Sequence, residues 1–209
     1  GKELVIATTR PETMFADQAI FVHPEDERYK DIVGMHAINP ANGEALPIMA
    51  DDYIDREFGT AVMKCTPAHD PNDFALAKKY DLAMPVCMND DATMNELALS
   101  YAGMDRFACR EALVAQFEKD GVVDHIEEIT HQVGHSERTG VVIEPYLSKQ
   151  WFVKMKPLAD EVLKYQDLED QKIHFYPQRF EKTFRQWLEN IEDWCISRQL
   201  WWGHRIPAW

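Results

Sequence analysis

The stretch Glu57–Phe74, EFGTAVMKCTPAHDPNDF, constrains the fold of this chain most, because it predicts a strand, a turn and the start of a helix in succession. The strand is expected over Thr60–Cys65. Asp70 suits the residue that caps a helix N-terminus, Pro71 the first helical position and Asp73 the third. Backbone N–H groups and the helix dipole at such a start favour ionised carboxylates. The stretch therefore predicts the floor of a pocket for a small charged ligand, although the same signature also begins helices that have no further role.

Five polar side chains of this stretch would gather where the strand meets the helix: Lys64, Thr66, His69, Asp70 and Asp73. The helix-start position should hold Asp73 ionised, as the binding of a cation requires. The His-Asp-x-x-Asp order also resembles a metal-ligand set, which leaves a metal-dependent hydrolase open as an alternative. Because Asp70 already suits a cap, we predict no metal at this site.

Short strands alternate irregularly with helices over most of the chain. We expect strands in the β-branched run Glu3–Thr9, in Ala19–Val22, and on both sides of the hairpin signal Asn42-Gly43. The clearest amphipathic helix is expected over Asp105–Asp120. This pattern predicts an α+β fold, with a mixed, β-barrel-like core and flanking helices, rather than a doubly wound sheet.

The composition changes near Ser148. All six tryptophans lie between Trp151 and Trp209. Two helical patterns occur in the same region, over Pro157–Tyr165 and Arg179–Asn190. We therefore expect one domain over residues 1–148 and a separate, mostly helical segment over residues 149–209.

Charge and cysteine usage limit the function classes. A net charge of −14 over 209 residues argues against a broad basic face for nucleic acid, although a local basic groove could still hold one. The four cysteines are far apart and form no C-x-x-C pair, which is typical of a reducing compartment rather than a disulfide framework. No apolar run approaches the ~20 residues of a membrane span. We expect a soluble, cytoplasmic protein that contacts no membrane.

Four blocks of the sequence together resemble the valyl-tRNA synthetases, in the same order and over nearly the whole chain. They are Thr8–Thr13 (TTRPET), the Glu57–Phe74 stretch, Ser136–Met155 (SERTGVVIEPYLSKQWFVKM) and Asp193–Trp209 (DWCISRQLWWGHRIPAW). The Trp-Trp-Gly-His wording of the last block is similar to the valine enzymes rather than to their leucine and isoleucine relatives. The resemblance implies that residues 1–148 are the inserted editing domain. Residues 149–209 would be an incomplete segment that returns to the catalytic domain of a class I synthetase.

The resemblance also implies an activity: hydrolysis of mischarged threonyl-tRNA(Val), or of threonyl-adenylate. The implied partners are the 3′ acceptor end of tRNA(Val), the threonine moiety and the remainder of the synthetase. Editing would need no cofactor. ATP and Mg would be needed only for valine ligation by the complete synthetase. Both ATP-handling signatures of this class, HIGH and KMSKS, are absent from the sequence, so we expect no valine activation by this chain alone.

Roles for individual residues follow from the positions that match the family. Asp73 would bind the ammonium group of the substrate, Thr66 and Lys64 would read its hydroxyl group and polarise the ester, and His69 would place a water molecule.

A second group of residues would bind the rest of the substrate. Thr8, Thr9 and Arg10 match the opposite wall, where the planar Arg10 guanidinium would hold the terminal adenosine or its phosphate. Phe58 could stack on the adenine. Asp70 would line the site or only cap the helix. The ordinary reading of Thr8 and Thr9 is as strand residues, that of Phe58 is as a core aromatic ring, and a lone lysine such as Lys64 is usually solvated.

The chain departs from the family in one wall of the expected site. Relatives mostly have Gly-Thr-Gly-Ala where this chain has Gly59-Thr60-Ala61-Val62, and alanine restricts the backbone that glycine leaves free. His131, His135 and Ser136 fall where some related synthetases carry a cysteine-rich zinc knuckle, but no cysteine stands there. Besides the metal-dependent hydrolase, a passive module that binds the tRNA 3′ end without turnover remains an alternative.

Overall fold

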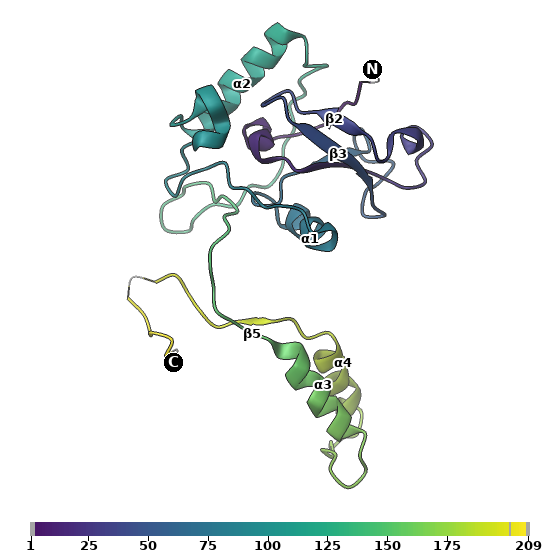
Figure 1. Ribbon diagram of the computed structural model, residues 1–209. Helices are drawn as coiled ribbons and strands as arrows, with labels where there is room; N and C mark the ends of the chain where they lie inside the picture. The colour runs from purple at the N-terminus through teal and green to yellow at the C-terminus, as the bar shows by residue number, and fades with distance from the viewer. Residues whose placement is uncertain (1–2, 201, 208–209) are drawn as a thin grey trace. The chain divides into compact units, whose positions relative to one another are not determined.

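Four strands form a mixed sheet in the computed structural model, which describes residues 3–200 and 202–207 (Figure 1). They are β1 (Ala19–Val22), β2 (His36–Ile38), β3 (Ala45–Ala50) and β4 (Val62–Cys65), and their spatial order is β2-β3-β1-β4. β1 runs parallel to β3 and antiparallel to β4, and β2 and β3 form an antiparallel hairpin. The chain divides into two compact units, Gly1–Leu147 and Ser148–Trp209, called here the N-terminal and C-terminal units.

The alternation of side chains along β1 places apolar groups on both faces of the sheet. Ile20 and Val22 join one core cluster, together with Ile48 of β3. Ala19 and Phe21 join a second cluster on the opposite face. That second face is covered by α1 (Pro71–Tyr80), whose Leu76 lies in the same cluster (Figure 1). A slip of one residue in the register of β1 would exchange these two sets of side chains between the clusters.

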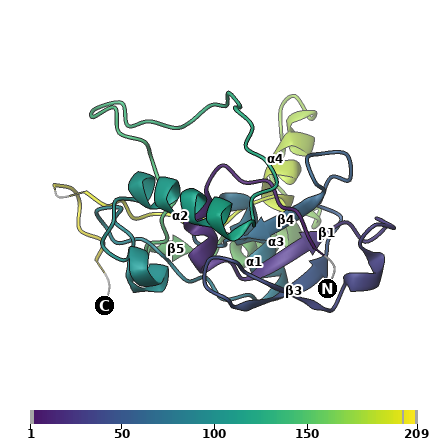
Figure 2. The same ribbon diagram turned by 90° about the horizontal axis from the view of Figure 1, so that it is seen from above.

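A third core cluster lies between helices. The 3₁₀-helix η1 (Pro11–Ala16) is buried along its whole length and packs against α2 (Arg106–Asp120) (Figure 2). Met14 and Phe15 of η1 meet Leu113 and Phe117 of α2 in this cluster. Two further 3₁₀-helices, η2 (Lys30–Ile32) and η3 (Glu96–Tyr101), complete the helical elements described in this unit.

Local signals in the sequence are confirmed where they rest on capping and turn chemistry. The hairpin turns at Gly43, whose φ of 77° needs glycine and whose N–H donates to Asn39 O at 2.8 Å. The helix expected over Asp105–Asp120 is α2, with Asp105 as its cap and Gly121 in the left-handed conformation at its end.

One expected strand is absent, and one feature of the expected core is not confirmed. The run Glu3–Thr9 forms no strand, because its backbone pairs with no neighbouring strand. Only its Leu4 and Ile6 side chains pack against the core clusters. The β-barrel-like core is not confirmed either. Among the described residues, the outer strands β2 and β4 are not paired with one another, so the α+β fold has a mixed sheet that does not close.

The C-terminal unit is a helical hairpin with a short two-stranded sheet. α3 (Met155–Gln166) and α4 (Phe180–Glu189) confirm the two predicted helices, and β5 (Phe152–Val153) pairs antiparallel with β6 (Trp194–Cys195). Most of its tryptophans are exposed to solvent, from 58% for Trp151 to 95% for Trp202. Trp201 and Trp209 lie outside the described residues. What each unit does stays a prediction.

The cysteines are unpaired, and they differ in burial. Cys65, Cys87 and Cys109 are buried and Cys195 is half-buried. Burial raises the pKa of the Cys65 and Cys87 thiols to about 12 and that of Cys109 to about 11. No helix in the described part of the chain is both long and apolar enough to cross a membrane.

The two units should differ in local stability. α2 buries Cys109, Leu113 and Phe117, whereas α4 buries none of its residues. Because amide exchange follows the free energy of local opening, amides of α4 should exchange with solvent at least ~10-fold faster than those of α2. Hydrogen exchange measured by NMR or mass spectrometry tests this. Equal protection of both helices would contradict it.

Candidate functional site

The N-terminus of α1 is built as its sequence indicates. The Asp70 carboxylate accepts hydrogen bonds from Asn72 N at 2.7 Å and Asp73 N at 3.2 Å, and Pro71 occupies the first turn. Two backbone donors that the helix leaves unpaired are thereby satisfied. Asp70 therefore has a capping role.

Asp73 is the carboxylate that faces inward from the same turn. Its side chain is buried, and Oδ2 accepts the Thr66 N–H at 2.7 Å. Burial raises the pKa of Asp73 to about 6, and the hydrogen bond from Thr66 only partly offsets this effect. The helix start therefore does not lower the pKa of Asp73, because desolvation outweighs the local dipole. At neutral pH the carboxylate is still mostly charged, since 7 lies above 6.

Lys64, Thr66 and two residues that the sequence did not single out form one hydrogen-bonded cluster. Lys64 Nζ donates to Thr13 Oγ1 and to Asp17 Oδ1, both at 3.0 Å, and also to Thr66 Oγ1. Thr66 Oγ1 in turn donates to Asp17 Oδ1. Because an ammonium group has three N–H donors, all three of Lys64 are used inside this cluster.

Asp17 is the anion at the centre of the cluster. It is 1% exposed, burial raises its pKa, and its Oδ2 has no hydrogen-bond partner. The ion pair with Lys64 compensates a buried charge that would otherwise be very costly.

His69 is fixed in the turn between Thr66 and α1. The ring is 1% exposed, and its Nε2 accepts the Cys87 N–H at 3.0 Å. A backbone N–H can only donate, so Nε2 carries no proton and the neutral ring has its proton on Nδ1. Nδ1 is buried without a partner. Burial lowers the pKa of His69 to about 4, so the ring stays neutral at physiological pH and offers one unused donor.

Arg10 belongs to a network of ion pairs rather than to an open wall. Its Nη1 donates to His69 O at 2.9 Å, and Nη2 pairs with Glu144. Glu12, which is fully buried, lies 3.4 Å from Arg10 Nε and accepts two hydrogen bonds from Arg110 of α2, at 2.7 and 2.8 Å. The role predicted for Arg10, holding adenosine or phosphate, stays a prediction; in the structure the guanidinium ties the His69 turn to residues far along the chain.

The remaining predicted residues lie on the surface. Thr8 and Thr9 are exposed, and Thr8 Oγ1 accepts the Arg10 N–H at 3.0 Å. Phe58 is 80% exposed in the loop before β4, so its ordinary reading as a core residue is wrong. In the same loop, Ala61 has a φ of 56°, a conformation that favours glycine. The departure from the family sequence therefore falls at a position where the backbone itself needs glycine-like freedom.

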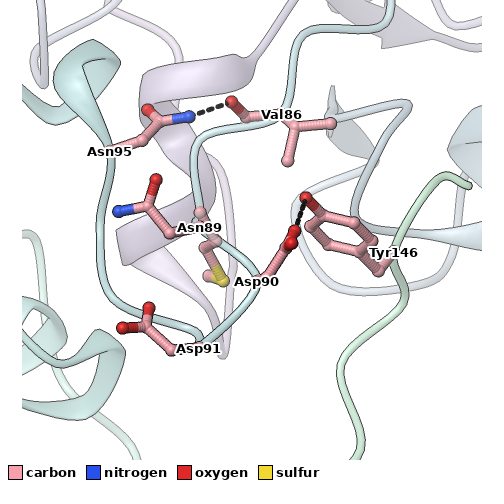
Figure 3. Close-up of a pocket in the computed structure, with 7 residues that line it drawn as sticks. Val86, Asn89, Asp90, Asp91, Asn95 and Tyr146 are labelled. Atoms are coloured by element: carbon pink, nitrogen blue, oxygen red, sulfur yellow. Dashed lines mark hydrogen bonds between the residues drawn. The ribbon is translucent and has the colours of Figure 1, made fainter.

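A surface pocket lies elsewhere in the N-terminal unit. It is lined by backbone and side chains of the loop after α1, with Tyr146 at one side (Figure 3). Tyr146 Oη donates to Asp90 Oδ1 at 2.7 Å, and Asn95 Nδ2 donates to Val86 O at 2.5 Å (Figure 3). None of the residues predicted from the sequence lines this pocket. Lys64, Thr66 and Asp73, which the sequence predicts for the site, lie instead at the hydrogen-bonded cluster described above.

The donor atoms of His69, Asp70 and Asp73 bear on the alternative of a metal-dependent hydrolase. In the described ranges, no three His, Cys, Asp or Glu side chains gather where they could hold a metal ion. The ligand set considered for the metal uses its atoms otherwise, because His69 Nε2 accepts from Cys87 and Asp70 caps α1. This donor arrangement does not favour a metal-dependent hydrolase.

Sequence reasoning missed the acidic partners of the site. Glu12 and Glu144 stand inside two of the quoted family blocks, and that position was the available signal. Asp17 and Cys87 stand in no motif, and only the fold brings them to Lys64 and His69.

Comparisons with known proteins place the chain among tRNA synthetases. The family model of tRNA synthetases class I (I, L, M and V) matches residues 4–209. The Valine--tRNA ligases of Bacillus licheniformis and Bacillus subtilis are each 59% identical over 204 residues, and that of Geobacillus kaustophilus is 58% identical. Each match covers 98% of this chain, which spans only 23% of the length of each relative.

A solved structure, the crystal structure of GlLeuRS-CP1, is similar with a TM-score of 0.46 and 14% sequence identity. The match covers 61% of this chain and 84% of that chain. A likeness at this level carries no argument about function.

The raised pKa of Asp73 gives a testable dependence of stability on pH. A carboxyl group with a folded-state pKa of about 6, above its ordinary 3.8, stabilises the fold below pH 3.8 and loses this contribution as the pH rises through about 6. Asp73→Asn cannot ionise and keeps an oxygen for the Thr66 N–H. The free energy of unfolding of Asp73→Asn, relative to that of the wild type, should therefore increase by on the order of 1–3 kcal/mol as the pH rises from ~4 to ~7.

Urea unfolding of both proteins across this pH range measures the difference. Asp52→Asn, at an exposed aspartate, is the matched control and should follow the wild type. A difference between Asp73→Asn and wild type that does not change with pH would show that Asp73 titrates normally.

Proposed function

The chain belongs to the class I tRNA synthetases for isoleucine, leucine, methionine and valine, and from this premise we propose that it carries the editing site of a valine-specific member. The proposed reaction is hydrolysis of the ester bond of threonyl-tRNA(Val). The observation that carries the proposal is the buried cluster in which Lys64, Thr66 and Asp73 meet at the N-terminus of α1. The high identity to Valine--tRNA ligases supports the choice of amino acid.

The chemistry of valine and threonine explains why a second site is needed. The two side chains are nearly isosteric, so a hydrophobic pocket rejects threonine only about 100-fold; valyl-tRNA synthetases are the standard example of this limit. A hydrolytic site must then accept the hydroxyl group of threonine and exclude valine, which has a second methyl group at that position. Such a site needs an anion for the ammonium group of the substrate and polar partners for its hydroxyl.

We assign the ammonium group to Asp73. One oxygen of this carboxylate is held by the Thr66 N–H, which fixes the direction in which the other oxygen points. With a pKa of about 6, Asp73 is charged at neutral pH and able to pair with a cation. Because it is buried, the pair would act in a medium of low dielectric constant, where it is stronger than at the surface.

We assign the hydroxyl group of threonine to Thr66. A hydroxyl group has one donor and two acceptor lone pairs. Thr66 gives its proton to Asp17 and accepts one hydrogen bond from Lys64, so one lone pair remains for the substrate hydroxyl. Lys64 has no N–H left for the ester and would act through its charge and by orienting Thr66. His69 Nδ1–H, the unused donor, would bind the attacking water molecule or the ester oxygen.

The partners in this proposal are the 3′ acceptor end of tRNA(Val), its threonine moiety and the rest of the synthetase. Editing would use no cofactor, whereas ATP and Mg would serve valine ligation by the complete enzyme. We propose a cytoplasmic location, consistent with cysteines that are all unpaired.

Deacylation of threonyl-tRNA(Val), compared with valyl-tRNA(Val), tests the proposal directly. The wild-type chain should hydrolyse the threonyl ester much faster. Asp73→Ala should lower kcat/KM at least ~30-fold, since removing one partner of a buried charge pair costs roughly 2–5 kcal/mol. Asp52→Ala, at an exposed aspartate, is the control and should leave kcat/KM unchanged.

The assay also separates the alternatives. Normal hydrolysis by folded Asp73→Ala protein would remove Asp73 from the site. Binding of tRNA without any hydrolysis would select the passive tRNA-end module. Activity that disappears on chelation would restore the metal-dependent hydrolase.

Thr66 should determine the preference for threonine. Thr66→Val keeps the shape of the side chain but removes the free lone pair, so the ratio of threonyl to valyl ester hydrolysis should fall ~10-fold or more. Thr66→Ser keeps the hydroxyl group and should keep most of the preference. The two kcat/KM values of each variant provide the comparison. If valine and serine at this position give the same ratio, the substrate hydroxyl is read by another group.

A further inference from the structure

The loop that leads into β4 carries an aromatic ring on the surface. Phe58 lies between Asp55 and Thr60, and 80% of its surface is exposed. A ring left in water gains nothing from the hydrophobic core, and a flat exposed ring is the group on which a nucleobase stacks. Arg56 in the same loop is paired with Glu25 only at 3.7 Å. The loop thus presents an aromatic ring next to a cation that is only loosely paired.

Two adjacent residues of a distant segment hold this loop at both ends. Arg28 Nη2 donates to Arg56 O at 3.0 Å, and Tyr29 Oη donates to Thr60 O at 3.0 Å. Phe58 stands between the two held carbonyl groups. The loop is therefore clamped on each side of its exposed ring.

The clamp itself rests on fixed groups. Arg28 is bound to the buried Asp26, with Nε–Oδ1 at 2.9 Å and Nη2–Oδ2 at 2.6 Å. Tyr29 packs against the core cluster that includes Ile20 and Val62. Tyr29 thus links the loop to the core, and Arg28 links the loop to the buried Asp26 carboxylate.

Inside the clamp the loop has an unusual backbone. Gly59 and Ala61 have φ values of 55° and 56°, and the Ala61 N–H donates to Phe58 O at 3.0 Å. Positive φ at an alanine is unfavourable by itself, so outside contacts are needed to hold it. The hydrogen bond from Tyr29 to Thr60 O acts on the residue between these two positions.

We propose that Tyr29 is a positioning residue for Phe58, and that through Thr60 it holds the ring ready to stack on the terminal adenine of a tRNA 3′ end. This inference rests on the proposed function for its substrate. Ordering the loop before binding avoids an entropic cost when the base arrives, so the clamp contributes to affinity although Tyr29 does not touch the base.

The experiment measures stacking without turnover. The probe is an RNA minihelix with the acceptor arm of tRNA(Val) and a single-stranded CCA end, whose terminal adenine is replaced by 2-aminopurine. Stacking on an aromatic ring quenches the fluorescence of this base. Wild-type chain should quench it on binding, and Phe58→Leu should abolish most of the quenching.

Tyr29→Phe removes only the hydroxyl group of the clamp. It should raise the Kd of the probe about 2- to 10-fold, as expected for one neutral hydrogen bond. In the Phe58→Leu background, Tyr29→Phe should change the Kd by less than ~1.5-fold, because its effect passes through the ring. Tyr80→Phe is the control: Tyr80 Oη lies 2.7 Å from Asp51 Oδ2 and 3.0 Å from Ala50 O, outside the Arg56–Thr60 segment, and the loss of this hydroxyl group should leave the Kd unchanged.

Two outcomes of the binding measurements would overturn the inference. A Tyr29→Phe protein that binds like the wild type, or the same loss in both backgrounds, would show that Tyr29 does not act through Phe58. Absence of quenching by the wild type would show that Phe58 is not a stacking platform. Hydrolysis of threonyl-tRNA(Val) is a separate measurement, so quenching without hydrolysis would reject the proposed reaction and leave the clamp standing.

Discussion

The ion pair between Asp17 and Lys64 is the interaction on which the site depends. Asp17 lies where η1 ends and β1 approaches, and Lys64 lies on β4, so the pair joins the first buried helix to the strand that leads to α1. A buried carboxylate is tolerated only when several donors compensate its charge. Lys64 and Thr66 supply those donors, and both are thereby held in one orientation. The Asp17 carboxylate can therefore be buried only while Lys64 and Thr66 keep the orientations that they have in the site.

Acidic residues hold most of the cations near the site. Glu12 pairs with Arg110, Glu144 pairs with Arg106, and Arg10 lies between the two carboxylates. The basic groups are therefore used inside the protein, which is consistent with a net charge of −14. In the described part of this unit, the arginines around the site have acidic partners, so few of them are left to pair with phosphate groups. Under the proposed function, recognition of the tRNA would then rely on the chain end, through stacking and hydrogen bonds, rather than on a continuous basic stripe.

Sequence patterns predicted those structural features that depend only on neighbouring residues, such as helix caps and turns. The Asp70 cap, the turn at Gly43 and the helix after Asp105 each depend on a few neighbouring residues, and all three are confirmed. The same reasoning was wrong for Glu3–Thr9, because a β-branched run does not reveal whether a neighbouring strand exists to pair with it. It also did not anticipate that the pKa of Asp73 is raised. The helix start is visible in the sequence, but the depth of burial that raises the pKa is not. Partners such as Asp17 and Glu144, 47 and 134 residues from the groups they bind, could be found only in the fold.

The burial of the thiols has a practical consequence for labelling. Three cysteines combine burial with a pKa of about 11 or 12, so almost none of each is present as the reactive thiolate at neutral pH. Cys195, the half-buried one, lies on β6 in the C-terminal unit. A maleimide or iodoacetamide dye would therefore attach mainly at this single position while the fold is intact. The native chain already contains a site for a fluorophore or spin label that reports on the C-terminal unit, and no cysteine needs to be engineered in or removed.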